Sequence, residues 1–180
     1  MDVVREVVEV EGGIVFGHDG SRCAQEALRW AGRLARRADL DLHVVRAWAM
    51  VTAPRPADWT PGYVPPLVEW EQAVRQELSA HVAAADLDPG VRVTCHVVHK
   101  APVPALMAAA RGANLLVVGA RGRGGFAGLL LGSVGDQLVH HAPCPVTVVR
   151  SGATGRELGP SEAATTAAIT AEPQSAGAVP

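Results

Sequence analysis

The sequence contains little cysteine, little lysine and few aromatic residues. Its three cysteines are an odd number without metal-binding spacing, so we expect reduced structural thiols, with a redox switch as the alternative. Lys100 is the only lysine. Residues 1–150 hold 15 acidic and 15 basic side chains, and this balance leaves no basic surface of the kind that binds nucleic acid.

Long apolar runs are also missing, although apolar residues make up 48% of the chain. No run approaches the roughly 20 residues that a membrane span requires. Charged residues are scattered through residues 1–12, which does not match a secretory signal peptide. We therefore expect a cytoplasmic protein with no membrane partner.

Several motifs of nucleotide-dependent enzymes are absent. The chain has no Gly-x-x-x-x-Gly-Lys-Ser/Thr loop, and no Gly-x-Gly-x-x-Gly follows its first predicted strand. No paired carboxylates accompany its glycine-rich segment to hold Mg²⁺. No serine–acid–histidine or cysteine–histidine constellation surrounds His18, and a metal at His140 and His141 would lack acidic or thiol ligands. We predict no catalytic residue, no metal site and a protein that binds its ligand rather than turning it over rapidly.

The sequence that is present divides into three parts. Residues 1–11 form an N-terminal extension, and residues 12–150 form one domain with enough apolar content for a full core. Residues 151–180 are mostly Ala, Gly, Ser, Thr, Pro and Glu, and a segment with so few large apolar side chains is expected to be disordered.

Strand and helix patterns alternate along the domain. Apolar runs predict strands at residues 13–17, 41–48, 91–98, 114–118 and 145–149, and helical spacing predicts helices from residue 21 to about 37 and at 66–85, 102–111 and 133–141. A long segment, residues 49–66, contains five prolines and separates the second strand from the second helix. This alternation indicates an α/β protein with a doubly wound, five-stranded parallel sheet.

The strand order decides where a ligand binds. An order of 3-2-1-4-5 reverses direction between strands one and four, so a ligand would bind beyond the carboxyl ends of these two strands. The polar residues after strand one and the glycine-rich segment after strand four would then share one crevice. An order of 2-1-3-4-5 would move the site.

The glycine-rich segment has the pattern Gly119-x2-Gly122-x9-Gly132-Ser133 and joins a predicted strand to a predicted helix. Glycines allow a close approach of the backbone, and a helix N-terminus presents N–H groups that suit phosphate. We therefore interpret it as a phosphate cradle, the alternative being glycines that only end a strand. Ser133 is expected to cap the helix, to donate its hydroxyl to phosphate, or both, with the N–H of Val134 beside it.

Three charged side chains have two interpretations each. Arg121 and Arg123 either pair with phosphate oxygens or remain solvated on the loop. Asp19 either caps the first helix or accepts a hydrogen bond from a ribose hydroxyl. His96 and His99 do not share a face of one strand, and we expect both to be surface residues.

These residues resemble the universal stress protein family, in its ATP-binding branch. The glycine pattern matches the nucleotide-binding signature of that family. Ile14 to Ser21 resembles its opening strand and Asp-Gly-Ser turn, Leu42 to Trp48 its second strand, and Pro143 to Val149 its closing strand. The resemblance covers residues 12–150. The chain departs from the family at Ala101, where glycine is usual before the proline, and at His18, where an apolar residue is frequent.

The resemblance implies a fold, a ligand and a partner. The fold is the Rossmann-like 3-2-1-4-5 sheet of adenine nucleotide α-hydrolases, and the ligand is ATP, with Mg²⁺ as its accompanying ion. The dimer contact implied is the final strand, Val146–Val149. The nucleotide-binding residues implied are Gly17 and Asp19 near the ribose and base, Ala47 near adenine, and Val118, Gly119, Gly122, Gly132, Ser133 and Val134 near ribose and phosphates.

We expect a nucleotide-dependent regulatory or stress-response factor that acts through an unidentified protein partner. Two alternatives remain open at this point. One is a slow ATP hydrolase, and the other is a dimeric scaffold whose glycine segment has only a structural role.

Overall fold

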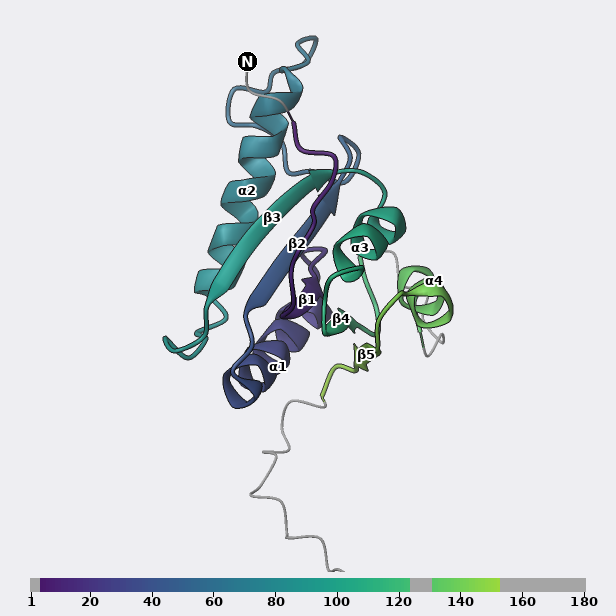
Figure 1. Cartoon of the computed structure of the whole chain (residues 1–180). Coiled ribbons are helices and arrows are strands. Elements are labelled where there is room, and N and C mark those ends of the chain that lie inside the picture. Colours follow the sequence, from purple (N-terminus) through teal and green to yellow (C-terminus); the bar gives the residue numbers. More distant parts are fainter. Residues whose placement is uncertain (1–3, 124–130, 153–180) are drawn as a thin grey trace, which may run out of the picture.

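The structure is a computed structural model, and it describes residues 4–123 and 131–152. Strands and helices alternate along the chain in the predicted order (Figure 1). The elements are β1 (Ile14–Gly17), α1 (Arg22–Ala38), β2 (Leu42–Trp48), α2 (Leu67–Ala83), β3 (Val93–His99), α3 (Pro102–Ala110), β4 (Leu115–Gly119), α4 (Ser133–His141) and β5 (Val146–Val149). The tail that was expected to be disordered lies outside the described residues from residue 153 onward, as do residues 124–130 of the glycine-rich segment.

The five strands form one parallel sheet in the order β3-β2-β1-β4-β5, which confirms the predicted topology. Strand β1 lies between β2 and β4, and Gly17 at its carboxyl end is in register with Val45 and Val118. Successive strands from β1 to β3 are added on one side of β1, and β4 and β5 are added on the other, so the strand order reverses between β1 and β4. The loops that follow these two strands emerge side by side.

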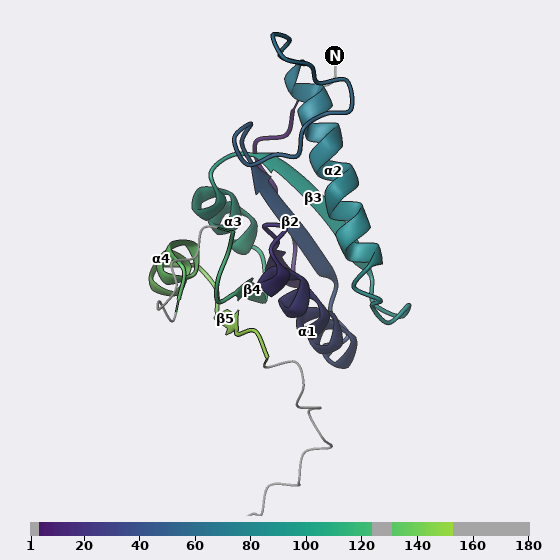
Figure 2. The same cartoon turned by 180° about the vertical axis from the view of Figure 1, so that it is seen from behind.

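Helices cover both faces of the sheet (Figures 1 and 2). Helices α1 and α2 cover one face, and α3 and α4 cover the other. Because successive strand residues point to opposite faces, Phe16 packs under α1 and α2 while its neighbour Val15 packs under α3 and α4. Both side chains are fully buried, and burial of such a side chain stabilises the fold by about 1.5–3 kcal/mol.

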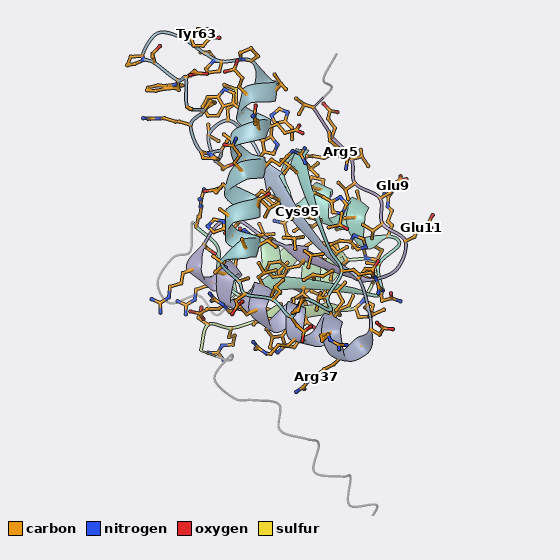
Figure 3. The ribbon with its side chains drawn as sticks, turned by 90° about the vertical axis from the view of Figure 1, so that its left-hand side faces the viewer. Arg5, Glu9, Glu11, Arg37, Tyr63 and Cys95 are labelled. Atoms are coloured by element: carbon orange, nitrogen blue, oxygen red, sulfur yellow. The ribbon has the colours of Figure 1, made fainter. Side chains whose placement is uncertain are left out.

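Residues 4–11 pack against the domain. Val8 and Val10 are buried in the core on the α3 and α4 face, and the N–H of His99 donates to the carbonyl of Arg5 at 2.9 Å. Gly112 lies so close to this segment that a Cβ there would be 1.9 Å from the carbonyl oxygen of Val10. Figure 3 shows Arg5, Glu9 and Glu11 along the outer side of the segment.

The element boundaries lie within a few residues of those predicted, and local contacts explain them. Ser21 caps α1, because its Oγ accepts a hydrogen bond from the N–H of Ala24 at 3.1 Å. The helix ends at Asp39, which adopts a left-handed conformation with φ 52°. Strand β3 begins two residues later than predicted, since Val91 still donates to the carbonyl of Asp88 in a turn. Over residues 4–123 and 131–152, none of the helices combines the length and the apolar character that crossing a bilayer requires.

Candidate functional site

The loops after β1 and β4 meet at the carboxyl edge of the sheet. The backbone N–H of Arg123, in the glycine-rich segment, donates to Oδ2 of Asp19 at 2.8 Å. This hydrogen bond joins residues that lie 104 positions apart in the sequence. The two polar segments therefore meet at this edge of the sheet, as predicted.

Two glycines allow this close approach. A Cβ at Gly122 would lie 2.5 Å from Oδ2 of Asp19, which is much shorter than a van der Waals contact. Gly20 has a φ of +80°, and a Cβ there would lie 2.7 Å from the guanidinium of Arg123. A side chain at Gly122 would push against the Asp19 carboxylate, and the positive φ of Gly20 favours glycine whatever the surrounding space.

The N-terminus of α4 lies beside this contact. Gly132 is the N-cap residue, in an extended conformation with φ −76° and ψ 157°, and within residues 4–123 and 131–152 no side chain caps the helix. The N–H of Gly132 donates to the carbonyl of Ala120 at 2.8 Å, and a Cβ on Gly132 would be 3.9 Å from the backbone nitrogen of Gly122. The positive end of the α4 dipole therefore faces the glycine-rich segment.

Ser133 is the first residue of α4, so the expectation that it caps this helix is wrong. The hydrogen bond from Gly132 to Ala120 holds Gly132 in the extended conformation, and Gly132 therefore takes the capping position. Ser133 keeps its hydroxyl outside the capping arrangement. Val134 follows within the first turn of α4.

Asp19 stabilises the turn before α1 but does not cap the helix, so the capping interpretation is wrong for this residue. Its Oδ1 accepts from the N–H of Ser21 at 2.9 Å, and Ser21 is the cap. Burial raises the pKa of the Asp19 carboxyl, but hydrogen bonds from Ser21 and Arg123 and the charge of Arg46 outweigh it, so the pKa lies below its usual value. The carboxylate is ionised at neutral pH.

The two arginines of the glycine-rich segment have different environments. The guanidinium of Arg123 donates to the carbonyl of Thr52 at 3.1 Å and pairs with Glu77 at 3.0 Å. Arg121 is exposed. Arg123 thus contacts residues of the 49–66 segment and of α2 in addition to the Asp19 turn.

A buried arginine that was not predicted from the sequence lies beside the site. Arg46 is 3% exposed, its Nη2 lies 3.2 Å from Oε2 of Glu77, and its Nη1 lies 3.4 Å from the carbonyl oxygen of His18. Its Nε has no hydrogen-bond partner among the described residues. The alternating pattern of β2 could have indicated this burial, because Arg46 stands between Val44 and Trp48 on the strand face that packs under α1 and α2.

His18 is also buried, at 3% exposure, and lies on the same face of the sheet. Its Nε2 is 3.4 Å from Oε1 of Gln25, and its ring centroid is 4.9 Å from that of His81. Burial lowers the pKa of His18 from 6.5 to about 4, and the charge of Arg46 acts in the same direction. His18 is therefore neutral at physiological pH.

The remaining candidate residues occupy the ends of the strands. Gly17 ends β1, where a Cβ would lie 2.9 Å from the side chain of Leu106. Val118 and Gly119 end β4, and Val118 is 5% exposed. Ala47 lies in β2, paired with Val98 of β3 and packed on the face that α3 covers, away from Arg46.

Two histidines outside the crevice differ from expectation. The Nε2 of His96 lies 3.2 Å from the Nδ1 of His43 on the neighbouring strand, and burial lowers the pKa of His96 to about 4. His99 stacks on Trp48, with ring centroids 4.5 Å apart. Both side chains are half-buried, so the expectation that they lie on the surface holds only in part, because their rings also pack against residues of the neighbouring strand. In the part of the chain that the structure describes, no three histidine, cysteine or acidic side chains gather as a metal site.

Comparison with known proteins identifies the family. The model of the universal stress protein family matches residues 13–150. The universal stress protein Rv2623 of Mycobacterium tuberculosis is 37% identical over 143 residues, which cover 76% of this chain and 47% of the relative. The universal stress protein Rv1996 of the same organism is 32% identical over 156 residues, with the same coverage. This chain spans about half the length of the curated relatives it matches.

Solved structures have the same fold. A universal stress protein solved in complex with cAMP is 28% identical, has a TM-score of 0.51 and is matched over 79% of this chain and 98% of its own. The protein UspA from Lactobacillus plantarum has a TM-score of 0.57 at 20% identity, over 79% and 99% of the two chains. Together with the match over residues 13–150, these similarities show that this chain belongs to the universal stress protein family.

Proposed function

We propose that this chain binds ATP in the crevice between β1 and β4 and acts as a nucleotide-dependent regulatory factor of the stress response. One observation carries the proposal. The Asp19 turn and the glycine-rich segment meet directly beside the N-terminus of α4, which has no side-chain cap. Backbone N–H groups and the helix dipole then face a space lined by glycines, an arrangement that suits phosphate.

The geometry supports a role for each candidate residue. Gly132, Ser133 and Val134 start α4 and would donate backbone and hydroxyl groups to phosphate oxygens. Gly119 and Gly122 would leave space for the phosphates and the ribose. Val118 at the end of β4 would lie beside them, and Gly17 and Asp19 would contact the ligand from the end of β1 and the turn after it. Ala47 would offer its backbone to adenine, and Arg121 and Arg123 would pair with phosphate oxygens.

Two further observations support an adenine nucleotide as the ligand. The solved relative in complex with cAMP is 28% identical to this chain, and the matched family model spans residues 13–150, which include every candidate residue. The described residues hold no group of three metal ligands, so Mg²⁺ that accompanies ATP would be held by phosphate oxygens and water. Regulation would follow from different ATP affinities of two conformations, one of which a protein partner recognises.

We also propose a homodimer through β5. Among the described residues this strand lies at one end of the sheet and pairs with β4 alone, so its outer edge would offer backbone groups to a second copy. An apolar strand with such an edge favours association, and a closed two-fold contact removes it.

A calorimetric titration of ATP into ligand-stripped protein tests nucleotide binding. We expect the wild type to bind, and the variant Gly122→Val to lose binding, because its side chain meets the Asp19 carboxylate. Gly132→Ala is the gentler variant, since among the described residues the nearest atom to its Cβ is the carbonyl oxygen of Ala120 at 3.6 Å. This variant should retain its thermal unfolding midpoint within a few degrees and still bind ATP more weakly. A wild-type protein that gives no heat with ATP would overturn the proposed function.

A further inference from the structure

We propose that Arg123 is a phosphate-sensitive latch of this site. In this structure its guanidinium ties the start of the glycine-rich segment, residues 119–123, to α2 and to the turn at residues 49–53. The phosphates of a bound adenine nucleotide take this guanidinium from Glu77, and the turn is released. The inference rests on the proposed function. It adds an explanation of how the phosphate groups of the ligand change the contacts of residues 49–53.

The contacts of Arg123 define the latched state. Its backbone N–H is fixed on Asp19 at 2.8 Å, while its side chain extends to Glu77 at 3.0 Å and to the carbonyl of Thr52 at 3.1 Å. One residue therefore joins the loop after β4 to the turn after β1, the segment after β2 and helix α2. The side chain crosses directly over Gly20, where a Cβ would lie 2.7 Å from the guanidinium.

Arg123 is the exchangeable arginine of this network. Glu77 accepts from two guanidinium groups, those of Arg46 and Arg123. The side chain of Arg46 is 4% exposed, whereas that of Arg123 is 46% exposed. A pair as exposed as the second changes an equilibrium constant by about fivefold at most. When Arg123 leaves, Glu77 keeps its buried partner.

Phosphate is a stronger competitor for this arginine. Guanidinium and phosphate form paired, charge-assisted hydrogen bonds that are roughly twice as strong as neutral ones. The phosphate position that we propose is at the start of α4, next to Arg123, because a Cβ on Gly132 would be 3.9 Å from the nitrogen of Gly122. In this proposal a change of side-chain rotamer exchanges Glu77 for phosphate, while the backbone N–H of Arg123 remains on Asp19.

The turn at residues 49–53 loses a hydrogen bond when Arg123 binds phosphate. The N–H groups of Thr52 and Ala53 both donate to the carbonyl of Ala49, and the carbonyl of Thr52 then accepts from Arg123. Met50 and Val51 lie exposed on the same turn. Loss of the Arg123 contact leaves this turn with only its local hydrogen bonds, and its amide protons should exchange faster.

The first test compares adenosine, AMP and ATP by calorimetric titration. In the variant Arg123→Gln we expect about tenfold weaker binding of ATP and unchanged binding of adenosine. In Glu77→Gln we expect a few-fold tighter binding of ATP, since the competitor is weakened. The matched control is Arg75→Gln. Arg75 is also half-exposed and pairs with a glutamate of α2, Glu71, but it has no contact with the crevice in the described structure.

The second test measures hydrogen exchange at Thr52 and Ala53. ATP should accelerate their exchange in the wild type, and adenosine should not. In Arg123→Gln the exchange should be fast with either ligand and without ligand. This readout does not depend on the stability of Glu77→Gln, which leaves Arg46 with a weaker partner.

The outcomes separate this inference from the proposed function. A wild type that binds none of the three ligands overturns both. A wild type that binds ATP, with an unchanged ATP-to-adenosine affinity ratio in Arg123→Gln or with Thr52 and Ala53 insensitive to ATP, overturns the latch alone.

Discussion

Arg46 and His18 place polar groups inside the layer between the sheet and helices α1 and α2. Both are 3% exposed, yet they differ in how the fold accommodates them. Arg46 keeps its charge because Glu77 lies 3.2 Å away, whereas His18 loses its charge because burial lowers its pKa to about 4. Each residue satisfies the rule that a charge removed from water is either paired or neutralised.

At this scale we expect Glu77→Ala to destabilise the protein. Removal of the carboxylate leaves the buried guanidinium of Arg46 without its ion-pair partner, which costs about 3 kcal/mol in the free energy of unfolding. The double variant Arg46→Met/Glu77→Leu should recover most of that loss, because neither charge of the pair remains. Urea denaturation measures both. Equal stabilities of wild type and Glu77→Ala would contradict the pairing.

A second prediction concerns pH. The pKa of His18 is about 4 in the folded protein and 6.5 in the unfolded chain, so the unfolded chain binds the proton more readily between these values. The stability that neutral His18 contributes is complete above pH 6.5 and is lost as the pH falls toward 4. His96 acts with the same sign.

Urea denaturation of wild type and His18→Gln between pH 4.5 and pH 7.5 checks this dependence. The variant should lose less stability on acidification than the wild type. His140→Gln, on the exposed face of α4, is the control. Parallel curves of stability against pH for wild type and His18→Gln would show that His18 does not contribute to the pH dependence of folding.

At the scale of elements, helices α1 and α4 begin in different ways. Ser21 caps α1 through its side chain, whereas α4 begins after Gly132 with no side-chain cap. The second arrangement leaves the first N–H groups of α4 available to an anion, and a capping side chain would compete with one. The sequence Gly-Ser indicated the helix start correctly but not which of the two residues takes the cap position.

The two serines therefore have opposite predicted phenotypes. Ser21→Ala should lower the free energy of unfolding by about 1 kcal/mol, because the N–H of Ala24 loses its partner. Ser133→Ala should change stability by no more than about 0.5 kcal/mol and should weaken ATP binding. Thermal denaturation and calorimetric titration of both variants measure the two effects. A loss of stability in Ser133→Ala with unchanged ATP affinity would assign this serine to the helix alone.

At the scale of the whole molecule, the two edge strands of the sheet, β3 and β5, have different neighbours. Strand β3 is contacted by residues 4–11 through the hydrogen bond between His99 and Arg5, while β5 ends the other side. This difference is the reason that we propose β5, rather than β3, as the contact for a second copy.

We expect the variant Thr147→Lys to dissociate the proposed dimer. Thr147 lies in β5 and is half-buried, and two copies paired across a two-fold axis would bring the new positive charges together. Sedimentation velocity of wild type and variant measures the change. A wild type that sediments as a monomer at all concentrations, or a variant that remains dimeric, would exclude this contact.

The sequence by itself determined the order and type of the elements and the ends of most of them. Apolar periodicity, Ser21 before α1 and Pro102 at the start of α3 are local signals, because they act through the chain within a few residues. The glycine spacing in the same way indicated the strand, loop and helix start around the candidate site.

Only the tertiary structure decided which charged groups pair and which become neutral. Arg46 lies 31 positions from Glu77, and Arg123 lies 46 positions from it, so their contact depends on how α2 packs over the sheet. The same packing buries His18 and fixes Asp19 between two loops. Distance in space, rather than along the chain, sets electrostatic and desolvation energies, and the packed layers alone bring these groups together.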